Sequence, residues 1–486
     1  MNYYAKDCEL VLALVAPVGV NLDDVETRLE SLLSQFGYST AIFHLSQIAA
    51  NLEGHQSSEH QSEAERLDAG MNLGNSLREK YDRGDVLALL AIQAINDRRG
   101  YEQDAPEPLS RAAHVIRSLK HEDEVETLRQ VYGPGFFLIG VSSSLESRKQ
   151  YLKELKGVPE EEIHRLIERD DKENRPLGQQ TRDVFQLADA FLTTDAPTVL
   201  ESQLGRIMDL IFSKPVVPPT AEEYPMFMAY AASLRSADLA RQVGAVIVNE
   251  KNDIISTGAN DVPAYGGGLY WTNQNDQRDY VRGCDSNEQE KIEIAKDAAT
   301  RILGEEAQSA DLEEAVKRLK GSKLMDITEY GRSVHAEMEA LLQAARNGTP
   351  VRGGTLFTTT YPCHNCTKHI VAAGIQKVIY IEPYPKSYAT TLHGDAVEDK
   401  GSQSSDKVEF KQFVGVGPRR FVDLFSMKLS SGRELPRKSE GRIIEWHRRQ
   451  GETRVPMSPL SYLDSEVSIR HELEELLEGG RDEKKG

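Results

Sequence analysis

Four side chains combine residue types and a spacing that could support metal-assisted hydrolysis. His335 and Glu337 are separated by one residue, and Cys363 and Cys366 follow as a C-x-x-C pair. One imidazole and two thiolates are typical zinc ligands, and three protein ligands leave the fourth tetrahedral position open, as in catalytic sites. Glu337 would then carry protons instead of binding the metal. A structural zinc, or a redox thiol pair beside an unrelated histidine, is the alternative interpretation.

With Pro362 directly before Cys363, the residues form the pattern H-x-E…P-C-x-x-C. This pattern is similar to the signature of zinc-dependent nucleobase deaminases. The resemblance implies a Zn²⁺ cofactor held by His335, Cys363 and Cys366, with Glu337 as the catalytic proton shuttle. The expected reaction is hydrolytic deamination of an amino-pyrimidine or amino-purine.

The elements that must position these residues can be predicted from the surrounding sequence. A helix is expected to begin near residues 333–335 and to stop at Asn347-Gly348. The β-branched run TLFTTT at residues 355–360 predicts a strand. Pro362 suits the first position of a second helix, which Gly374 would end. Two helix N-termini should therefore meet at one ion across a strand.

Length and composition restrict the class of protein. A chain of 486 residues has room for two to four domains, and 39% apolar with 28% charged residues is typical of a soluble globular protein. Four cysteines exclude a disulfide scaffold, and no apolar run is long enough to span a bilayer, so we expect a cytoplasmic enzyme. The net charge of −19 favours a free nucleotide over a nucleic-acid polymer as substrate.

The first 215 residues predict a parallel α/β domain. Strands are expected at residues 10–18, 39–43, 136–141 and 187–194, with helices at 23–34 and 199–212. The order resembles P-loop nucleoside and nucleotide kinases, which implies a phosphate loop at Gly19. However, the lysine and Ser/Thr of G-x-x-x-x-G-K-[ST] are absent, so a plain strand–helix turn is an equal alternative. We expect this domain to regulate the enzyme without efficient phosphoryl transfer.

A proline-rich segment, KPVVPPT at residues 214–220, marks the domain boundary. We predict a linker at 216–225, a second domain at 226–425 with an insert at 262–330, and a charged extension at 426–486. The motifs QVGAVIV, GANDVP, HAEMEAL, TLFTTTYPCHNC and AGIQKVIY resemble the deoxycytidylate deaminases in order. That resemblance implies an α/β/α sandwich around a five-stranded sheet and a sugar-binding role for Asn260. The insert offers only Cys284, so we expect no second metal there.

Two stretches in the C-terminal part, EPYPKS and GPRRF, extend the resemblance to the bacterial anti-phage dCTP deaminases. This implies use of dCTP and dCMP, antiviral depletion of the dCTP pool, an inhibitory small RNA and a homo-oligomer, a hexamer by analogy. Arg419 and Arg420 are candidates to bind substrate phosphate, with a solvated basic pair as the alternative. The zinc signature is also compatible with a polynucleotide-editing deaminase, a metabolic dCMP deaminase or a silenced nucleotide sensor.

Overall fold

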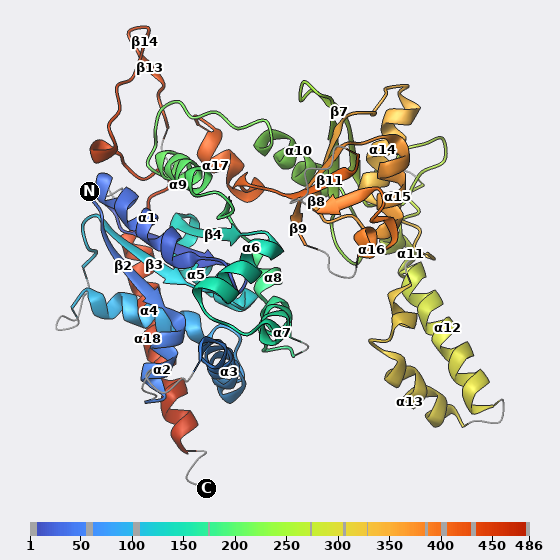
Figure 1. Ribbon diagram of the computed structural model, residues 1–486, viewed down its shortest axis with the longest axis horizontal. Helices are drawn as coiled ribbons and strands as arrows, with labels where there is room; N and C mark the ends of the chain where they lie inside the picture. Colours follow the sequence, from blue (N-terminus) through green and yellow to red (C-terminus); the bar gives the residue numbers. More distant parts are fainter. Residues whose placement is uncertain are drawn as a thin grey trace. The chain divides into compact units, whose positions relative to one another are not determined.

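The computed structural model describes residues 7–54, 62–100, 107–173, 175–272, 275–304, 308–327, 329–383, 387–399, 406–428 and 434–482 (Figure 1). The chain forms two compact units, one of residues Met1–Glu223 with Phe413–Gly486 and one of Tyr224–Gln412. The second unit ends at Gln412, whereas the expected second domain ended at residue 425. Residues 413–425 belong to the first unit, together with the segment expected to be a separate extension.

The first unit is built on a mostly parallel sheet. Its parallel strands are β1 (Leu10–Val15), β2 (Ser39–His44), β3 (Ala112–Arg117), β4 (Phe136–Ser142) and β5 (Ala190–Thr193), in the spatial order β2-β3-β1-β4-β5. The short β12 (Gly415–Val416) adds to β5 in the antiparallel direction. The central strand β1 reads LVLALV and is buried throughout, as expected for a strand covered by helices on both faces.

Helices surround this sheet, and the sequence explains several of their ends. Asn21 caps α1 by accepting from the Asp24 amide at 3.3 Å, as its residue type predicts. The helices are α1 (Leu22–Gln35), α2 (Leu45–Leu52), α3 (Glu63–Tyr81), α4 (Val86–Arg98), α5 (Glu122–Tyr132), α6 (Leu145–Gln150), α7 (Glu160–Asp171), α8 (Thr181–Phe185), α9 (Pro197–Ile211), α17 (Phe421–Phe425) and α18 (Pro459–Asp482). A π-helical turn, Tyr151–Leu155, follows α6, and a small hairpin pairs β13 (Lys438–Ser439) with β14 (Arg442–Ile443).

Helix α18 is an integral part of the first unit, because it completes a buried charge network. The Arg99 guanidinium pairs with Glu9 from the start of the sheet and with Glu466 from α18, and all three side chains are fully buried. The Tyr132 hydroxyl donates to Glu466 at 2.8 Å, and Tyr462 donates to Glu9 at 2.5 Å. Burial by itself would raise the pKa of Glu9, but the His114 and Arg99 contacts lower it to about 2.

The second unit also contains a six-stranded sheet, in the order β10-β11-β9-β8-β6-β7. The strands are β6 (Gly244–Val248), β7 (Ile254–Ala259), β8 (Thr355–Thr360), β9 (Lys377–Glu382), β10 (Val397–Asp399) and β11 (Val408–Gln412). Strands β6 and β7 form an antiparallel hairpin, and β8, β9, β11 and β10 run parallel to one another. The sheet thus has one strand more than the five implied by the family resemblance. The additional strand is β10, which has three residues and lies at the edge of the sheet.

Two strand glycines let helices approach opposite faces of this sheet. A Cβ on Gly244 would lie 1.9 Å from the Ala229 carbonyl in α10 (Glu223–Ser233), and one on Gly258 would lie 2.1 Å from the Ala336 carbonyl in α14 (Ala336–Arg346). Gly244 pairs with Ala259, the neighbour of Gly258, so the two glycines face opposite sides. The unit is therefore an α/β/α sandwich, with α14 and α15 (His364–Ala373) on the face away from α10 (Figure 1).

The remaining helices of the second unit are α11 (Asp279–Arg282), α12 (Ser286–Leu303), α13 (Ser309–Leu319) and α16 (Ala389–His393). Helices α12 and α13 lie within the insert expected at residues 262–330, and they pack against each other. Residues 305–307 between them lie outside the described part, as do Tyr384, Pro385 and Lys386 of EPYPKS. Among the described helices, none is long and apolar enough to cross a membrane.

Candidate metal-dependent active site

The candidate metal ligands lie at the beginnings of α14 and α15. His335 is the N-cap of α14, and Cys363 is the N-cap of α15, where its sulfur accepts from the Cys366 amide at 3.5 Å. The prediction that Pro362 is the first helical residue is therefore wrong by two positions, since α15 begins at His364. Gly374 ends α15 in a left-handed conformation, as predicted.

The three candidate ligand atoms have a separation suited to one zinc ion. His335 Nδ1 lies 3.3 Å from Cys366 Sγ and 3.4 Å from Cys363 Sγ, and all three ligand atoms lie within 4.8 Å of one another. Tetrahedral zinc with ordinary Zn–S and Zn–N bonds separates sulfur from nitrogen by about 3.5 Å. The donor set and its geometry therefore fit zinc.

Glu337 lies beside this cluster in a buried position. The residue is 4% exposed, and Cys366 Sγ lies 3.5 Å from Glu337 Oε2. Burial raises the pKa of the Glu337 carboxyl, whereas a hydrogen bond with Cys366 lowers the pKa of Cys363 to about 3. A hydrogen bond with Cys363 also raises the pKa of His335. A carboxyl group that holds protons more readily than usual thus adjoins a thiolate-bearing cluster.

Asn260, at the end of β7, is buried and anchors a neighbouring loop. Its Oδ1 accepts from the Val243 amide at 2.6 Å, and its Nδ2 donates to the Arg241 carbonyl at 2.8 Å. An amide side chain has two donors and two acceptor lone pairs, so these contacts use only half of its capacity. The structure thus gives Asn260 a scaffolding role that the sequence did not predict. Its sugar-binding role stays a prediction.

Arg241 is a further candidate functional residue that sequence reasoning missed. Its side chain is about half exposed, pairs with Glu382 at 3.5 Å and contributes to the electrostatic environment of His335. Glu382 also accepts from Thr360 Oγ1 at 2.6 Å, which connects this pair to the end of β8. The sequence shows a basic residue directly before QVGAVIV, which could have drawn attention to Arg241. That Arg241 lies near His335, however, can be known only from the tertiary fold.

Arg419 and Arg420 lie in the first unit, whereas the metal-ligand cluster lies in the second. Arg420 is buried, donates to the Phe136 carbonyl and pairs with Asp189 at 3.3 Å and Asp423 at 3.2 Å. These contacts stabilise the sheet end of the first unit and occupy the Arg420 guanidinium. Its surroundings give no support to a role as a phosphate clamp. Arg419 is exposed.

The Gly19 turn connects β1 to α1, and protein groups fill the space around it. Gly19 has a φ of +91°, and a Cβ there would lie 2.9 Å from Arg148 Cβ. The neighbouring Val18 amide donates to the buried Asp170 carboxylate at 2.7 Å, and Lys120 donates to the same carboxylate at 2.6 Å. The Val18 amide and the Lys120 ammonium group are thus both bound to a carboxylate of the protein itself.

Comparison with known proteins places the second unit in a family. Residues 219–382 match the family model described as the cytidine and deoxycytidylate deaminase zinc-binding region. The deoxycytidylate deaminase of Enterobacteria phage T4 is 34% identical over 170 residues, covering 33% of this chain and 77% of the phage protein. The chain belongs to the deoxycytidylate deaminase family. The matched range includes the complete His335, Glu337, Cys363 and Cys366 set.

Other deoxycytidylate deaminases are also similar to part of the chain. The mouse deoxycytidylate deaminase is 29% identical over 204 residues, covering 42% of this chain and 81% of the mouse protein. A solved dCMP deaminase from the cyanophage S-TIM5, in complex with dCMP and dUMP, is 20% identical, with a TM-score of 0.25. The similar region covers 41% of this chain and 100% of the cyanophage protein chain. The cofactor of the protein whose sequence is given above is zinc, in agreement with the donor set of His335, Cys363 and Cys366.

Proposed function

We propose that the protein is a zinc-dependent hydrolytic deaminase of free deoxycytidine nucleotides, dCTP and dCMP. His335, Cys363 and Cys366 would hold the zinc ion, and Glu337 would be the catalytic proton carrier. The observation that carries this proposal is the buried Glu337 carboxyl next to a cluster of three protein ligands. A site with three ligands has room for water, and a binding-only site has no use for this carboxyl group.

The side chains account for the movement of protons. When bound, zinc supplies Lewis acidity that lowers the pKa of water to about 7. Glu337 accepts a proton from the attacking water and passes it to the ring nitrogen. It then accepts the proton of the newly added hydroxyl group and passes it to the departing amine, so that ammonia leaves and a carbonyl remains. Burial raises the pKa of Glu337, so its carboxyl group holds a proton more readily between the two transfers.

Three observations support deoxycytidine nucleotides as the substrate class. The relatives that match the second unit are named deoxycytidylate deaminases. Asn260 retains unused hydrogen-bonding capacity for a sugar hydroxyl, and Arg241 is a partly exposed cation in the same loop region. The net charge of −19 disfavours a polynucleotide substrate.

The proposed role of Glu337 is tested by Glu337→Gln, with Glu339→Gln as the matched control. Both glutamates are buried in the first turns of α14, but Glu339 pairs with Arg346 at 2.6 Å. We expect Glu337→Gln to retain zinc and to lose about 10²- to 10⁴-fold in turnover, the usual contribution of a general acid–base. Ammonia release from dCMP and dCTP measures the rate, and metal analysis measures the zinc content.

Near wild-type turnover by Glu337→Gln would contradict the proposal, as would an equal loss in Glu339→Gln. Cytidine and adenosine nucleotides and single-stranded oligonucleotides should be assayed in parallel. Faster deamination of an oligonucleotide than of any free nucleotide would favour a polynucleotide-editing enzyme, and a strict preference for dCMP would favour a metabolic role.

We further propose that the enzyme acts in the cytoplasm and depletes dCTP in anti-phage defence. In this proposal the first unit is a P-loop-kinase-like regulatory domain, and the partners are an inhibitory small RNA and further copies of the chain, forming a hexamer. The support is the resemblance at EPYPKS and GPRRF together with the parallel sheet of the first unit.

Cells expressing wild-type protein should restrict phage and lose dCTP on infection, whereas cells expressing Glu337→Gln should do neither. Light scattering measures the oligomer, and copurified RNA identifies the inhibitor.

A further inference from the structure

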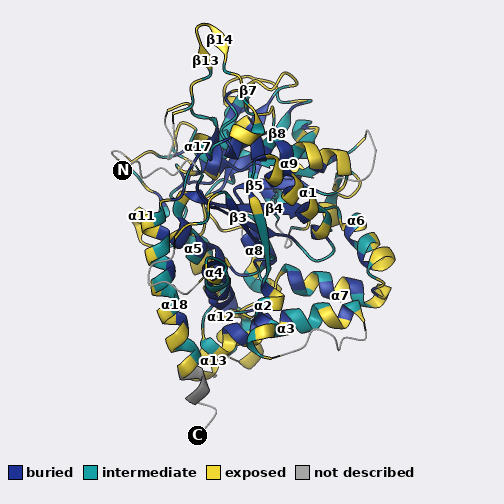
Figure 2. Ribbon diagram, turned by 90° about the vertical axis from the view of Figure 1, so that its left-hand side faces the viewer, coloured by how far each residue is buried: buried dark blue, intermediate teal, exposed yellow. Residues whose placement is uncertain are grey.

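Two residues, Tyr361 and Pro362, connect β8 to the candidate ligand Cys363. Strand β8 is largely buried and ends at Thr360 (Figure 2). Thr360 Oγ1 donates to the Glu382 carboxylate at 2.6 Å, and the Tyr361 amide donates to the Glu382 carbonyl at 2.8 Å. Contacts with the end of β9 therefore hold the backbone as far as Tyr361.

Pro362 restricts the path of the chain from Tyr361 to Cys363. Its ring fixes its own φ, and the residue before a proline is confined to extended conformations. The main remaining freedom is rotation about ψ of Pro362, which turns the Pro362 carbonyl together with the planar peptide to Cys363. A contact that holds this carbonyl therefore sets the direction in which the chain enters Cys363.

Ser387 provides a contact of this kind. Its Oγ donates to the Pro362 carbonyl at 2.7 Å and accepts from the Ala389 amide at 3.2 Å. A hydroxyl group has one hydrogen to donate, and the contact with Ala389 leaves that hydrogen for Pro362. Pro362 is buried and has no amide hydrogen, so the carbonyl is its only backbone hydrogen-bonding group.

Cys363 is thus held from both of its sides. On the helix side, its carbonyl accepts from the Thr367 amide at 2.9 Å, and its Sγ accepts from the Cys366 amide at 3.5 Å. On the strand side, Ser387 holds the preceding carbonyl, and the residue that donates to Ser387 begins α16, which packs against α15. Ser387 therefore ties α16 to the peptide that enters the metal-ligand cluster.

We propose that Ser387 is a positioning residue for the metal ligand Cys363. By holding the Pro362 carbonyl, it keeps Cys363 Sγ at the 3.4 Å from His335 Nδ1 that one zinc ion requires. Residues that orient a metal ligand matter for binding, and their loss costs about 10- to 100-fold in metal affinity or activity. The inference rests on the proposed ligand set and does not depend on which nucleotide is the substrate. It also gives EPYPKS, whose last residue is Ser387, a role at the metal site.

The zinc affinity of the full-length protein tests the proposal. Metal-free protein is titrated with zinc in competition with a chromophoric chelator. Ser387→Ala removes the donor to the Pro362 carbonyl, so it should bind zinc about tenfold or more weakly than the wild type. Ser387→Thr keeps a hydroxyl group on the same carbon atom, so its zinc affinity should match that of the wild type.

The absorption spectrum of the cobalt-loaded protein gives a second measurement. The bands of Co²⁺ depend on the geometry of its site and on its thiolate ligands. They should change in Ser387→Ala and return in Ser387→Thr. A general loss of stability would lower the melting temperature without altering these bands.

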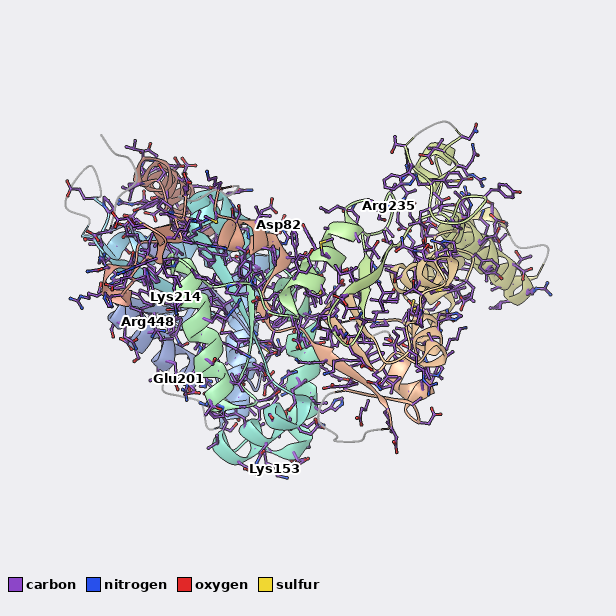
Figure 3. All side chains as sticks on the ribbon, turned by 90° about the horizontal axis from the view of Figure 1, so that it is seen from above. Asp82, Lys153, Glu201, Lys214, Arg235 and Arg448 are labelled. Atoms are coloured by element: carbon purple, nitrogen blue, oxygen red, sulfur yellow. The ribbon has the colours of Figure 1, made fainter. Side chains whose placement is uncertain are left out.

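Two variants serve as controls and should bind zinc like the wild type. Ser286→Ala is the matched change, because Ser286 Oγ also donates to a backbone carbonyl, that of Tyr330 at 3.2 Å, but within the insert. Arg235→Met controls for stability. Arg235 follows the end of α10 (Figure 3), donates to the Tyr270 carbonyl at 3.0 Å and lies 4.0 Å from the centre of the Trp271 ring, so its loss should lower the melting temperature.

Three results would overturn the proposal. The first is a zinc affinity and a cobalt spectrum of Ser387→Ala that match the wild type. The second is a loss that Ser387→Thr fails to restore, which would assign the effect to packing. The third is an equal loss in Ser286→Ala.

Cys363→Ser, measured in parallel, separates this inference from the ligand assignment. If Cys363→Ser loses zinc and Ser387→Ala does not, the positioning role alone is wrong. If Cys363→Ser retains full zinc affinity, both the ligand assignment and the positioning role are wrong.

Discussion

Replacement of Asn260 by alanine should release the loop at residues 241–243 as well as weaken catalysis. The change leaves the buried Val243 amide without an acceptor and the part-buried Arg241 carbonyl without its donor. The unsatisfied Val243 amide costs about 1–3 kcal/mol, and loss of the part-buried hydrogen bond to the Arg241 carbonyl costs about 1 kcal/mol more, so we expect a total of about 2–4 kcal/mol. This loop carries Arg241, so kcat/KM should fall as well.

Hydrogen exchange at the Val243 amide is the sharpest assay of this argument. A local loss of about 2–4 kcal/mol corresponds to roughly 30- to 1000-fold faster exchange, at 1.4 kcal/mol per tenfold change. Asn260→Asp keeps the acceptor for Val243 and should preserve most of the protection, although its carboxylate repels the Arg241 carbonyl. The two variants therefore separate the Val243 contact from the Arg241 contact.

Asn249→Ala is a suitable control, because Asn249 also accepts from two backbone amides, those of Lys251 and Asp253, but at the exposed turn of the same hairpin. It should leave both the Val243 amide and the activity unchanged. Unaltered exchange of Val243 in Asn260→Ala would refute the anchoring role, whatever the effect on activity. Unaltered kcat/KM despite faster exchange would instead remove Asn260 and its loop from substrate binding.

Three further predictions concern the metal, the packing of α14 and the response to acid. Cys363→Ser and Cys366→Ser should each lose zinc by metal analysis, because a hydroxyl replaces a thiolate poorly. Gly258→Ala should lower the melting temperature and the zinc content, since its Cβ would lie 2.1 Å from a carbonyl of α14 and overpacking costs about 1–3 kcal/mol. The pKa of Glu9 falls from 4.5 to about 2 on folding, so its stabilising contribution is complete above pH 4.5 and is lost as pH falls towards 2. Acid titration of unfolding should therefore be less steep in Glu9→Gln over that interval.

Each of these predictions has a control or a contradicting result. Gly70→Ala adds a Cβ that meets no atom within 4 Å, so it should not lower the melting temperature. Full zinc occupancy in both serine variants would contradict the ligand assignment. An acid titration of Glu9→Gln that superimposes on that of the wild type would contradict the pKa argument, and Glu201→Gln, which changes a 71% exposed carboxylate, is the matched control.

Short-range signals in the sequence were enough to predict that the three candidate metal ligands lie together. His335 and Cys363 begin helices, Gly374 ends one, and β8 lies between them, so local rules bring the four chemical residues close to one another. The strand β3 escaped prediction because it contains His114, which reads as polar although Glu9 pairs with it in the core. A pairing between two polar residues that lie far apart in the sequence cannot be recognised from local hydropathy.

The roles of residues that depend on distant partners were also beyond sequence reasoning. Arg420 looked like an anion-binding residue, but Asp189 and the Phe136 carbonyl, far away in the chain, occupy its guanidinium. The charged tail looked like an extension, because nothing near Glu466 in the sequence indicates its pairing with Arg99. In both cases the charge pattern was visible, but the partner was not.

The first unit is interrupted in the sequence by the whole of the second, which has a consequence for biosynthesis. The ribosome releases β1 to β5 before the second unit, whereas β12 and α18 emerge after it. Until then Arg99 lacks Glu466, and Glu9 lacks the Tyr462 hydroxyl. The second unit can therefore complete its fold on the nascent chain while the first is still unfinished. A chain that terminates prematurely near residue 413 would contain a finished deaminase unit beside a first unit without its closing helix.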